Sequence, residues 1–243
     1  MLISSKAIVL KHYKYSENSI ICKIYTEELG IKSYLINNLR SKKAQNKIAW
    51  YQSLTLLDLV VYNKEKKQLQ HIKEASCSEP LMTVHCQVHK SSIALFIAEI
   101  LLKTIKEEEA NAALFAFIEH FIKILDKTPT DYADFHLIFM LQLTHYLGFY
   151  PKMESYTTNA YFDMIEGKFS SNKPLHATFI ESNLSNYFYS LLNADYANSN
   201  TLNLNGRLRN LILENIIMYY KTHLEGIGII HSSEVLKMVF EGK

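Results

Sequence analysis

A run of basic residues without acidic neighbours is the feature of this sequence most suited to chemistry. The stretch "NNLRSKKAQNK" spans residues 37–47 and contains Arg40, Lys42, Lys43 and Lys47. Arginine and lysine side chains are the usual protein partners of phosphate oxygens. The run therefore predicts either a surface that binds an anion or an ordinary solvated loop.

Two other predicted loops, residues 12–17 ("HYKYSE") and 63–67 ("NKEKK"), share the same sign of charge. Cations interleaved with aromatic rings suit single-stranded nucleic acid, because the cations meet phosphates and the ring faces stack on bases. The residues that we assign to this role in the two loops are Lys14, Tyr15, Lys64, Lys66 and Lys67.

The charge of the chain is distributed unevenly. The 243 residues carry a formal net charge of only +2. Residues 1–79 hold 13 Lys and Arg against 7 Asp and Glu, a net charge of +6, so residues 80–243 carry −4. Such asymmetry indicates a basic module with a polyanionic partner, although chance clustering produces the same count.

The elements that must position these loops are five short strands, followed by helices. Alternating or continuous apolar runs predict strands, and Gly30 suits a hairpin turn between the second and third. Five strands in so short a segment favour a small barrel of the OB type, which binds nucleic acid on its second and third strands. The strands are expected at residues 6–11, 18–26, 31–37, 54–62 and 68–77.

The second and third strands offer Lys23, Tyr25, Lys32 and Tyr34 to a nucleic acid. The alternative for the two tyrosines is packing across neighbouring strands, which is common in any sheet.

Beyond Pro80 the apolar residues repeat with helical spacing. We therefore predict an α+β protein: an OB-fold nucleic-acid-binding domain at residues 1–79 and an α-helical domain at 80–243. Residues 150–182 lack this spacing and predict a small insertion of short strands or irregular structure. Arg207 and Arg209, at the start of a C-terminal helix, extend the basic track or serve as solvated cap residues. The helices are expected at residues 91–105, 111–127, 130–148, 183–193, 205–224 and 232–240.

Catalysis and metal binding find little support in the sequence. The chain has no GxGxxG, GxxxxGK[ST], GxSxG or HExxH motif, so we expect no enzyme. Cys77, His85, Cys86 and His89 lack the paired spacing of a structural zinc site. No apolar stretch is long enough to span a membrane, and the early lysines do not fit a signal peptide. We therefore expect a cytoplasmic protein.

The order of these landmarks resembles the RecO family of bacterial DNA repair proteins. The resemblance lies in "AIVL" at 7–10 with Tyr15 and Glu17, in Thr26 with Gly30, in "NLR" at 38–40, and in the strand leads 51–54 and 69–74. It continues more loosely through residues 141–153 and 219–236.

The resemblance implies an OB barrel, a helical domain, and often a zinc-binding insertion. It also implies a recombination mediator, associated with the nucleoid, that binds single- and double-stranded DNA and anneals strands. The implied partners are RecR and the acidic C-terminal tail of the single-stranded-DNA-binding protein, with which such proteins help to load the recombinase. None of this breaks covalent bonds.

Two positions depart from the family pattern. The insertion has no cysteine where paired zinc ligands are expected, so we expect no cofactor there and packing by aromatic residues instead. Asn38 replaces the usual glycine before Arg40. The aromatic residues expected to hold the insertion are Tyr156, Tyr161, Phe162, Phe169 and Phe179.

A second hypothesis makes the helical half the main working surface. It would recruit repair partners through an apolar groove with a basic rim, and DNA binding would be secondary. The candidate rim residues are Lys103, Lys106, Lys123 and Lys127, with simple solvation as the alternative.

Overall fold

The computed structural model describes residues 1–37, 48–64, 66–106, 109–197 and 199–241. The chain forms two compact units, Met1–Lys127 and Thr128–Lys243. The first unit therefore joins two helices to the strands. The domain boundary expected at residue 79 stays a prediction.

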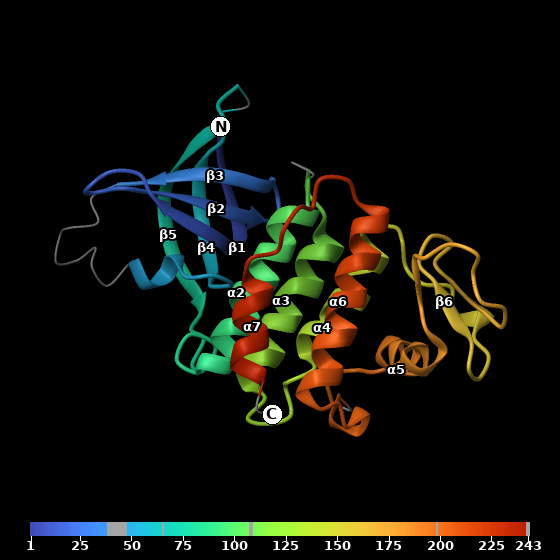
Figure 1. Ribbon diagram of the computed structural model, residues 1–243. Coiled ribbons are helices and arrows are strands. Elements are labelled where there is room, and N and C mark those ends of the chain that lie inside the picture. The colour runs from blue at the N-terminus through green and yellow to red at the C-terminus, as the bar shows by residue number, and fades with distance from the viewer. Residues whose placement is uncertain (38–47, 65, 107–108, 198, 242–243) are drawn as a thin grey trace. The chain divides into compact units, whose positions relative to one another are not determined.

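A closed five-stranded barrel begins the first unit, with strand order β1-β2-β3-β5-β4 (Figure 1). Neighbouring strands are antiparallel except β3 and β5, which pair in parallel through Ser33 and Leu69 and the residues that follow. This confirms the predicted barrel of an α+β protein. The strands are β1 (Leu2–Lys14), β2 (Ile20–Thr26), β3 (Gly30–Ile36), β4 (Leu56–Tyr62) and β5 (Leu69–Glu79), with a short 3₁₀ helix η1 (Ile48–Tyr51) before β4.

The barrel interior collects one side of each strand, because side chains alternate across a strand. Cys22 on β2 faces Tyr34 on β3, and both are buried with Leu57 and Leu59 of β4. Gly30 has φ +63°, so the tight β2–β3 turn uses the left-handed conformation that glycine adopts freely.

Two helices complete the first unit, α2 (Val88–Thr104) and α3 (Ala112–Lys127). The ring of Phe115 on α3 lies 5.8 Å from the ring of Tyr25 on β2, which covers that part of the barrel. The Asp126 carboxylate at the end of α3 accepts hydrogen bonds from the Thr83 and Val84 N–H groups, fixing the chain between β5 and α2.

The second unit is mainly helical. Its helix α4 is buried on almost every side, as its run of apolar residues requires, and the Tyr220 hydroxyl of α6 donates to the Met140 carbonyl of α4. The helices are α4 (Phe135–Tyr146), α5 (Ser182–Leu192), α6 (Gly206–His223) and α7 (Ser232–Phe240), with 3₁₀ helices η2 (Met153–Ser155) and η3 (Ser199–Leu202).

The insertion contains a small sheet of order β7-β6-β8, built from β6 (Tyr161–Asp163), β7 (Lys168–Ser170) and β8 (Phe179–Ile180). Its packing is aromatic, as expected. The Phe162 ring lies 4.9 Å from Phe169 and 4.5 Å from Phe188 of α5, and the Tyr156 ring stacks on Tyr189 at 3.6 Å.

Candidate nucleic-acid interface

The turn between β4 and β5 is fixed by a buried glutamine. The Gln70 side chain is only 4% exposed, and its amide accepts from the Lys64 N–H and donates to the Lys64 and Lys67 carbonyls. A buried amide that satisfies three backbone groups holds a turn in one conformation. The side chains of Lys64, Lys66 and Lys67 next to these hydrogen bonds are exposed.

A basic hollow of about 360 Å³ lies beside this turn. Lys66 and Lys67 line one part of it, while Lys23 of β2 and Lys32 of β3 line another. The remaining lining is neutral, and no acidic residue of the described chain contributes. A hollow walled by one sign of charge concentrates the potential and attracts the opposite charge. The arrangement suits the anionic oxygens of a phosphate backbone.

Lys11, which the sequence did not suggest, adds to this charge. It lies directly opposite Lys23 in the pairing of β1 with β2, and like charges in that position destabilise a sheet. The Lys11 ammonium also lies 5.1 Å from the centre of the Tyr13 ring. Lys11 was missed because the sequence does not give the register that places it opposite Lys23. An anion bound between the two lysines would relieve their repulsion.

Two tyrosines at the end of β1 present ring surface to solvent. Tyr13 is 44% exposed and Tyr15 is 62% exposed. The Tyr15 N–H donates to the Ser19 carbonyl, which closes the turn into β2. Lys14 between them is also exposed. These rings are available for stacking, as the sequence predicted for Tyr15.

Tyr25 and Tyr34 are not available to bases, and their expected role is wrong. Tyr25 is 1% exposed beneath Phe115 of α3, and its hydroxyl donates to the Asn111 carbonyl. Tyr34 is fully buried inside the barrel, where it pairs with Cys22. The packing alternative holds for both tyrosines. In the pairing of β2 with β3, Lys32 lies opposite the buried Ile24, so the side chains of Lys23 and Lys32 start from different faces of the sheet. Both residues nevertheless line the basic hollow.

Arg209 is removed from the DNA-contacting set by its burial. Its side chain is 4% exposed and donates to Asp134 and to the Leu204 carbonyl. Arg207, two residues earlier in the same helix, is exposed. The cap of this helix is neither arginine but Asn205, whose side chain accepts from the Leu208 N–H.

The four basic residues of the opening run, Arg40, Lys42, Lys43 and Lys47, lie outside the described residues. Their assignment stays a prediction.

The lysines proposed as a rim are occupied by neighbouring carboxylates. Lys123 lies 3.0 Å from Glu79 and 3.1 Å from Glu119, and Lys127 lies 3.7 Å from Glu79. These contacts fix α3 against the end of β5. Lys103 pairs with Glu99 along α2. Lys106, beyond the end of α2, is exposed.

Comparison with known proteins decides the family. Residues 1–81 match the family described as "Recombination protein O N terminal", and residues 87–232 match "Recombination protein O C terminal". The chain belongs to the RecO family of DNA repair proteins.

The similarity to individual RecO proteins extends over the whole chain. The DNA repair protein RecO of Flavobacterium psychrophilum is 42% identical over 99% of this chain and 100% of its own length. Those of Bacteroides fragilis and Porphyromonas gingivalis are 36% and 28% identical, with the same coverage. The barrel therefore belongs to the RecO N-terminal region, and α2 to α6 lie within the C-terminal match.

The insertion of this RecO protein does not fit zinc. Residues 150–182 contain no cysteine, and no three His, Cys, Asp or Glu side chains of the described chain are placed to hold a metal ion. Asp163 instead accepts from the Ile165 and Glu166 N–H groups and contacts His176 Nε2 at 3.1 Å. The Thr178 N–H donates to His176 Nδ1, so one hydrogen-bond network joins the β6–β7 turn to the following loop.

No helix among the described residues is both long enough and apolar enough to cross a membrane.

Proposed function

We propose that this protein is a non-enzymatic recombination mediator that binds single- and double-stranded DNA and anneals complementary strands. We further propose that it helps to load the recombinase together with RecR. The observation that carries the proposal is the basic hollow of Lys23, Lys32, Lys66 and Lys67 on the barrel, with Lys11 facing Lys23. Membership of the RecO family supports it.

The proposed mechanism is electrostatic and involves no covalent step. Lysines in and beside the hollow neutralise phosphates and release counterions, which drives association. Tyr13 and Tyr15 offer ring faces to unpaired bases. Neutralising the backbones of two complementary strands lowers the repulsion that opposes their pairing. We propose that Arg40, Lys42, Lys43 and Lys47 continue this surface, with Lys14 and Lys64 beside it.

The direct test replaces Lys23, Lys32, Lys66 and Lys67 with glutamine in the full chain. Affinity for a fluorescently labelled single strand is measured over a series of salt concentrations, and duplex DNA is measured in parallel. If each lysine meets one phosphate, the slope of log affinity against log salt becomes less steep by about 3, from about 0.7 per phosphate on single strands.

A matched control replaces four exposed lysines elsewhere, Lys127, Lys152, Lys168 and Lys221, with glutamine. It removes the same net charge from positions outside the basic hollow, so most of the salt dependence should remain. Equal losses in the two variants would mean that only net charge matters, and an unchanged slope in the first would reject the hollow as the DNA site.

A groove of about 360 Å³ between α6 and α7 favours a second candidate function, recruitment of a partner tail. Its apolar lining includes Met218 and Ile229, which are 52% and 70% exposed. Lys221 also lines it, as does Lys237, which pairs with Glu214 and Glu234. Flexible methionine side chains adapt to varied partners. This groove, with Lys221 and its exposed apolar side chains, is our candidate for the acidic tail of the single-stranded-DNA-binding protein.

Titration with a labelled acidic tail peptide tests this candidate, with a scrambled peptide of equal charge as the comparison. If the tail binds specifically in the groove, the scrambled peptide should bind the wild type more weakly than the tail does. The tail should also bind more weakly to a Met218→Asp variant, which places a negative charge in the groove. Equal affinity for both peptides would reject a specific site.

A further inference from the structure

A second and larger hollow, of about 760 Å³, lies on the barrel where β1, β4 and β5 run side by side. Lys6 of β1 faces Asp58 of β4, which in turn faces Ser76 of β5, and all three line the hollow. Its other wall is the β2–β3 turn. That turn is held in place because the Glu27 N–H donates to the Lys6 carbonyl and the Glu28 N–H donates to the Ser5 hydroxyl.

The charge of this acidic hollow is opposite to that of the basic hollow. Four carboxylates line it, against the ammonium groups of Lys6 and Lys73; the carboxylates belong to Glu27, Glu28, Asp58 and Glu74.

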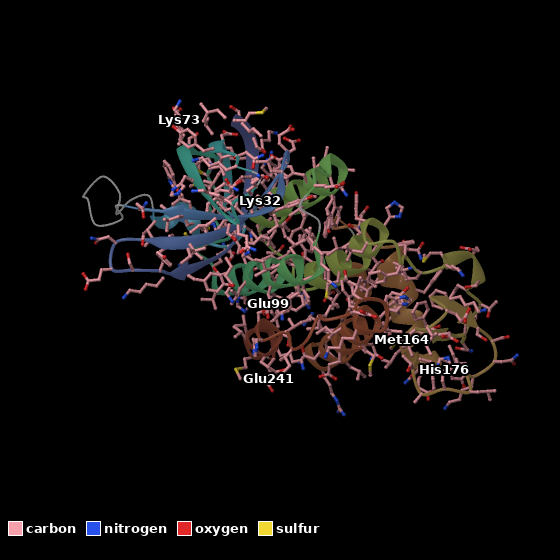
Figure 2. All side chains as sticks on the ribbon, turned by 90° about the horizontal axis from the view of Figure 1, so that it is seen from above. Lys32, Lys73, Glu99, Met164, His176 and Glu241 are labelled. Atoms are coloured by element: carbon pink, nitrogen blue, oxygen red, sulfur yellow. The ribbon has the colours of Figure 1, made fainter. Side chains whose placement is uncertain are left out.

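Both lysines of the acidic hollow already have carboxylate partners. Lys6 lies 3.7 Å from Glu119, and Lys73, which extends into solvent at the rim, lies 3.3 Å from Glu74 (Figure 2). By contrast, Glu27, Glu28 and Asp58 form no ion pair with any described residue. The hollow therefore carries uncompensated negative charge.

The shape and chemistry of the acidic hollow select among cationic ligands. Nucleic acid is repelled by it. A metal ion is disfavoured because no three acidic, His or Cys side chains of the described chain converge closely enough to hold one. The volume is that of a site for a ligand of several linked groups rather than for a single ion. The Ser4 and Ser76 side chains add neutral hydrogen-bonding groups suited to a peptide.

We propose that the acidic hollow is a docking site for a lysine- or arginine-rich segment of a protein partner. Charge complementarity carries the proposal: Glu27, Glu28 and Asp58 lack cations that such a segment supplies. The site is separate from the basic hollow, since the two share no lining residue. We expect a partner segment bound there to leave the basic hollow open to DNA. The inference does not depend on the proposed DNA site.

The test uses the full chain and a short fluorescein-labelled peptide of alternating lysine and glycine residues. Fluorescence anisotropy compares the wild type with a Glu27→Gln, Glu28→Gln, Asp58→Asn variant. The variant should bind the peptide about tenfold more weakly, because three exposed ion pairs are lost. A control variant removes the same charge from exposed positions of the second unit, through Glu154→Gln, Glu166→Gln and Glu241→Gln, and should bind as the wild type does.

A peptide carrying a photoreactive group then maps the contact by mass spectrometry, with labelled residues expected within 27–28, 58–60 or 73–76. Equal peptide affinity in the wild type and the hollow variant, or an equal loss in the control variant, would overturn the proposal. It would also be overturned by cross-links confined to other segments. A loss of DNA affinity in the hollow variant would count against it too, because removing negative charge from a protein face not used by DNA cannot weaken DNA binding.

Discussion

The Arg209 guanidinium donates a hydrogen bond of 2.6 Å from Nε to Oδ1 of Asp134, and both side chains are buried within the second unit. Arg209 comes from the first turns of α6, whereas Asp134 immediately precedes α4. Burial raises the pKa of Asp134, and the neighbouring Arg209 charge opposes that rise. The pair thus joins the start of α6 to the start of α4 through two buried charges.

Breaking this pair from one side should destabilise the second unit strongly. An Asp134→Ala variant leaves the Arg209 charge buried without its partner and should lower the free energy of unfolding by about 3–5 kcal/mol. Chemical denaturation followed by circular dichroism measures the loss. A double variant, Asp134→Leu with Arg209→Met, should recover much of it, since no lone charge remains. A loss below about 1 kcal/mol in the single variant would contradict the assignment.

His136 should make stability fall in mild acid. Burial and the nearby Arg209 charge lower its pKa to about 3. Arg209 is the same residue that pairs with Asp134. The native state therefore binds fewer protons than the unfolded state between that value and the ordinary pKa near 6.5. The stabilisation is complete above pH 6.5 and is lost progressively below it, by about 2 kcal/mol at pH 5.

Chemical unfolding curves measured at room temperature over a series of pH values from about 5 to 7.5 test this expectation. A His136→Gln variant is the reference. The raised pKa of Asp134 contributes with the opposite sign, but it is present in both proteins, so the difference between the two profiles isolates His136. Parallel profiles would contradict the prediction.

Gln70 should affect DNA binding although it carries no charge. A Gln70→Leu variant leaves backbone groups of Lys64 and Lys67 without their buried partner, which costs about 1–3 kcal/mol of stability. The turn lysines then lose their fixed position. Affinity for single-stranded DNA should fall in a folded protein whose net charge is unchanged. Full affinity with reduced stability would limit Gln70 to a structural role.

The spacing of the apolar residues was sufficient to predict the five strands of the barrel and the later helices, but not the three-stranded sheet of the insertion. It could not predict the register of β1 against β2, and so the position of Lys11 opposite Lys23 was missed. It also could not predict the covering of Tyr25, because a strand tyrosine looks the same until a helix distant in sequence, α3, packs on it.

Buried polar residues were equally hidden. Gln70 and Arg209 have sequence neighbours typical of solvated positions, and their roles depend on backbone groups and a carboxylate brought near by folding. Its position at the start of a predicted helix made Arg209 a candidate for the basic track, whereas its partner Asp134 lies 75 residues away.

The local stability of the insertion should depend on the hydrogen bonds that Asp163 accepts. Burial opposes ionisation of Asp163, but hydrogen bonds from the Glu166 N–H and from His176 outweigh it and lower its pKa. The stabilisation is thus present above the ordinary pKa of aspartate and is lost as pH falls through the lowered value. An Asp163→Ala variant should show faster amide hydrogen exchange in residues 161–180 at neutral pH, with little change in α4. Uniform exchange rates in the variant and the wild type would contradict this role.

Tyr15 and Tyr34 should respond oppositely to truncation. Tyr15→Ala removes an exposed ring and should weaken single-stranded DNA binding by about 1–3 kcal/mol if one base stacks on it, while stability stays within about 0.5 kcal/mol. Tyr34→Ala empties part of the barrel core and should lower stability by about 3–5 kcal/mol. DNA affinity and unfolding are measured for both, with Tyr62→Ala as a control for an exposed tyrosine on β4. Equal losses of affinity at positions 15 and 62 would show that the stacking assignment is wrong.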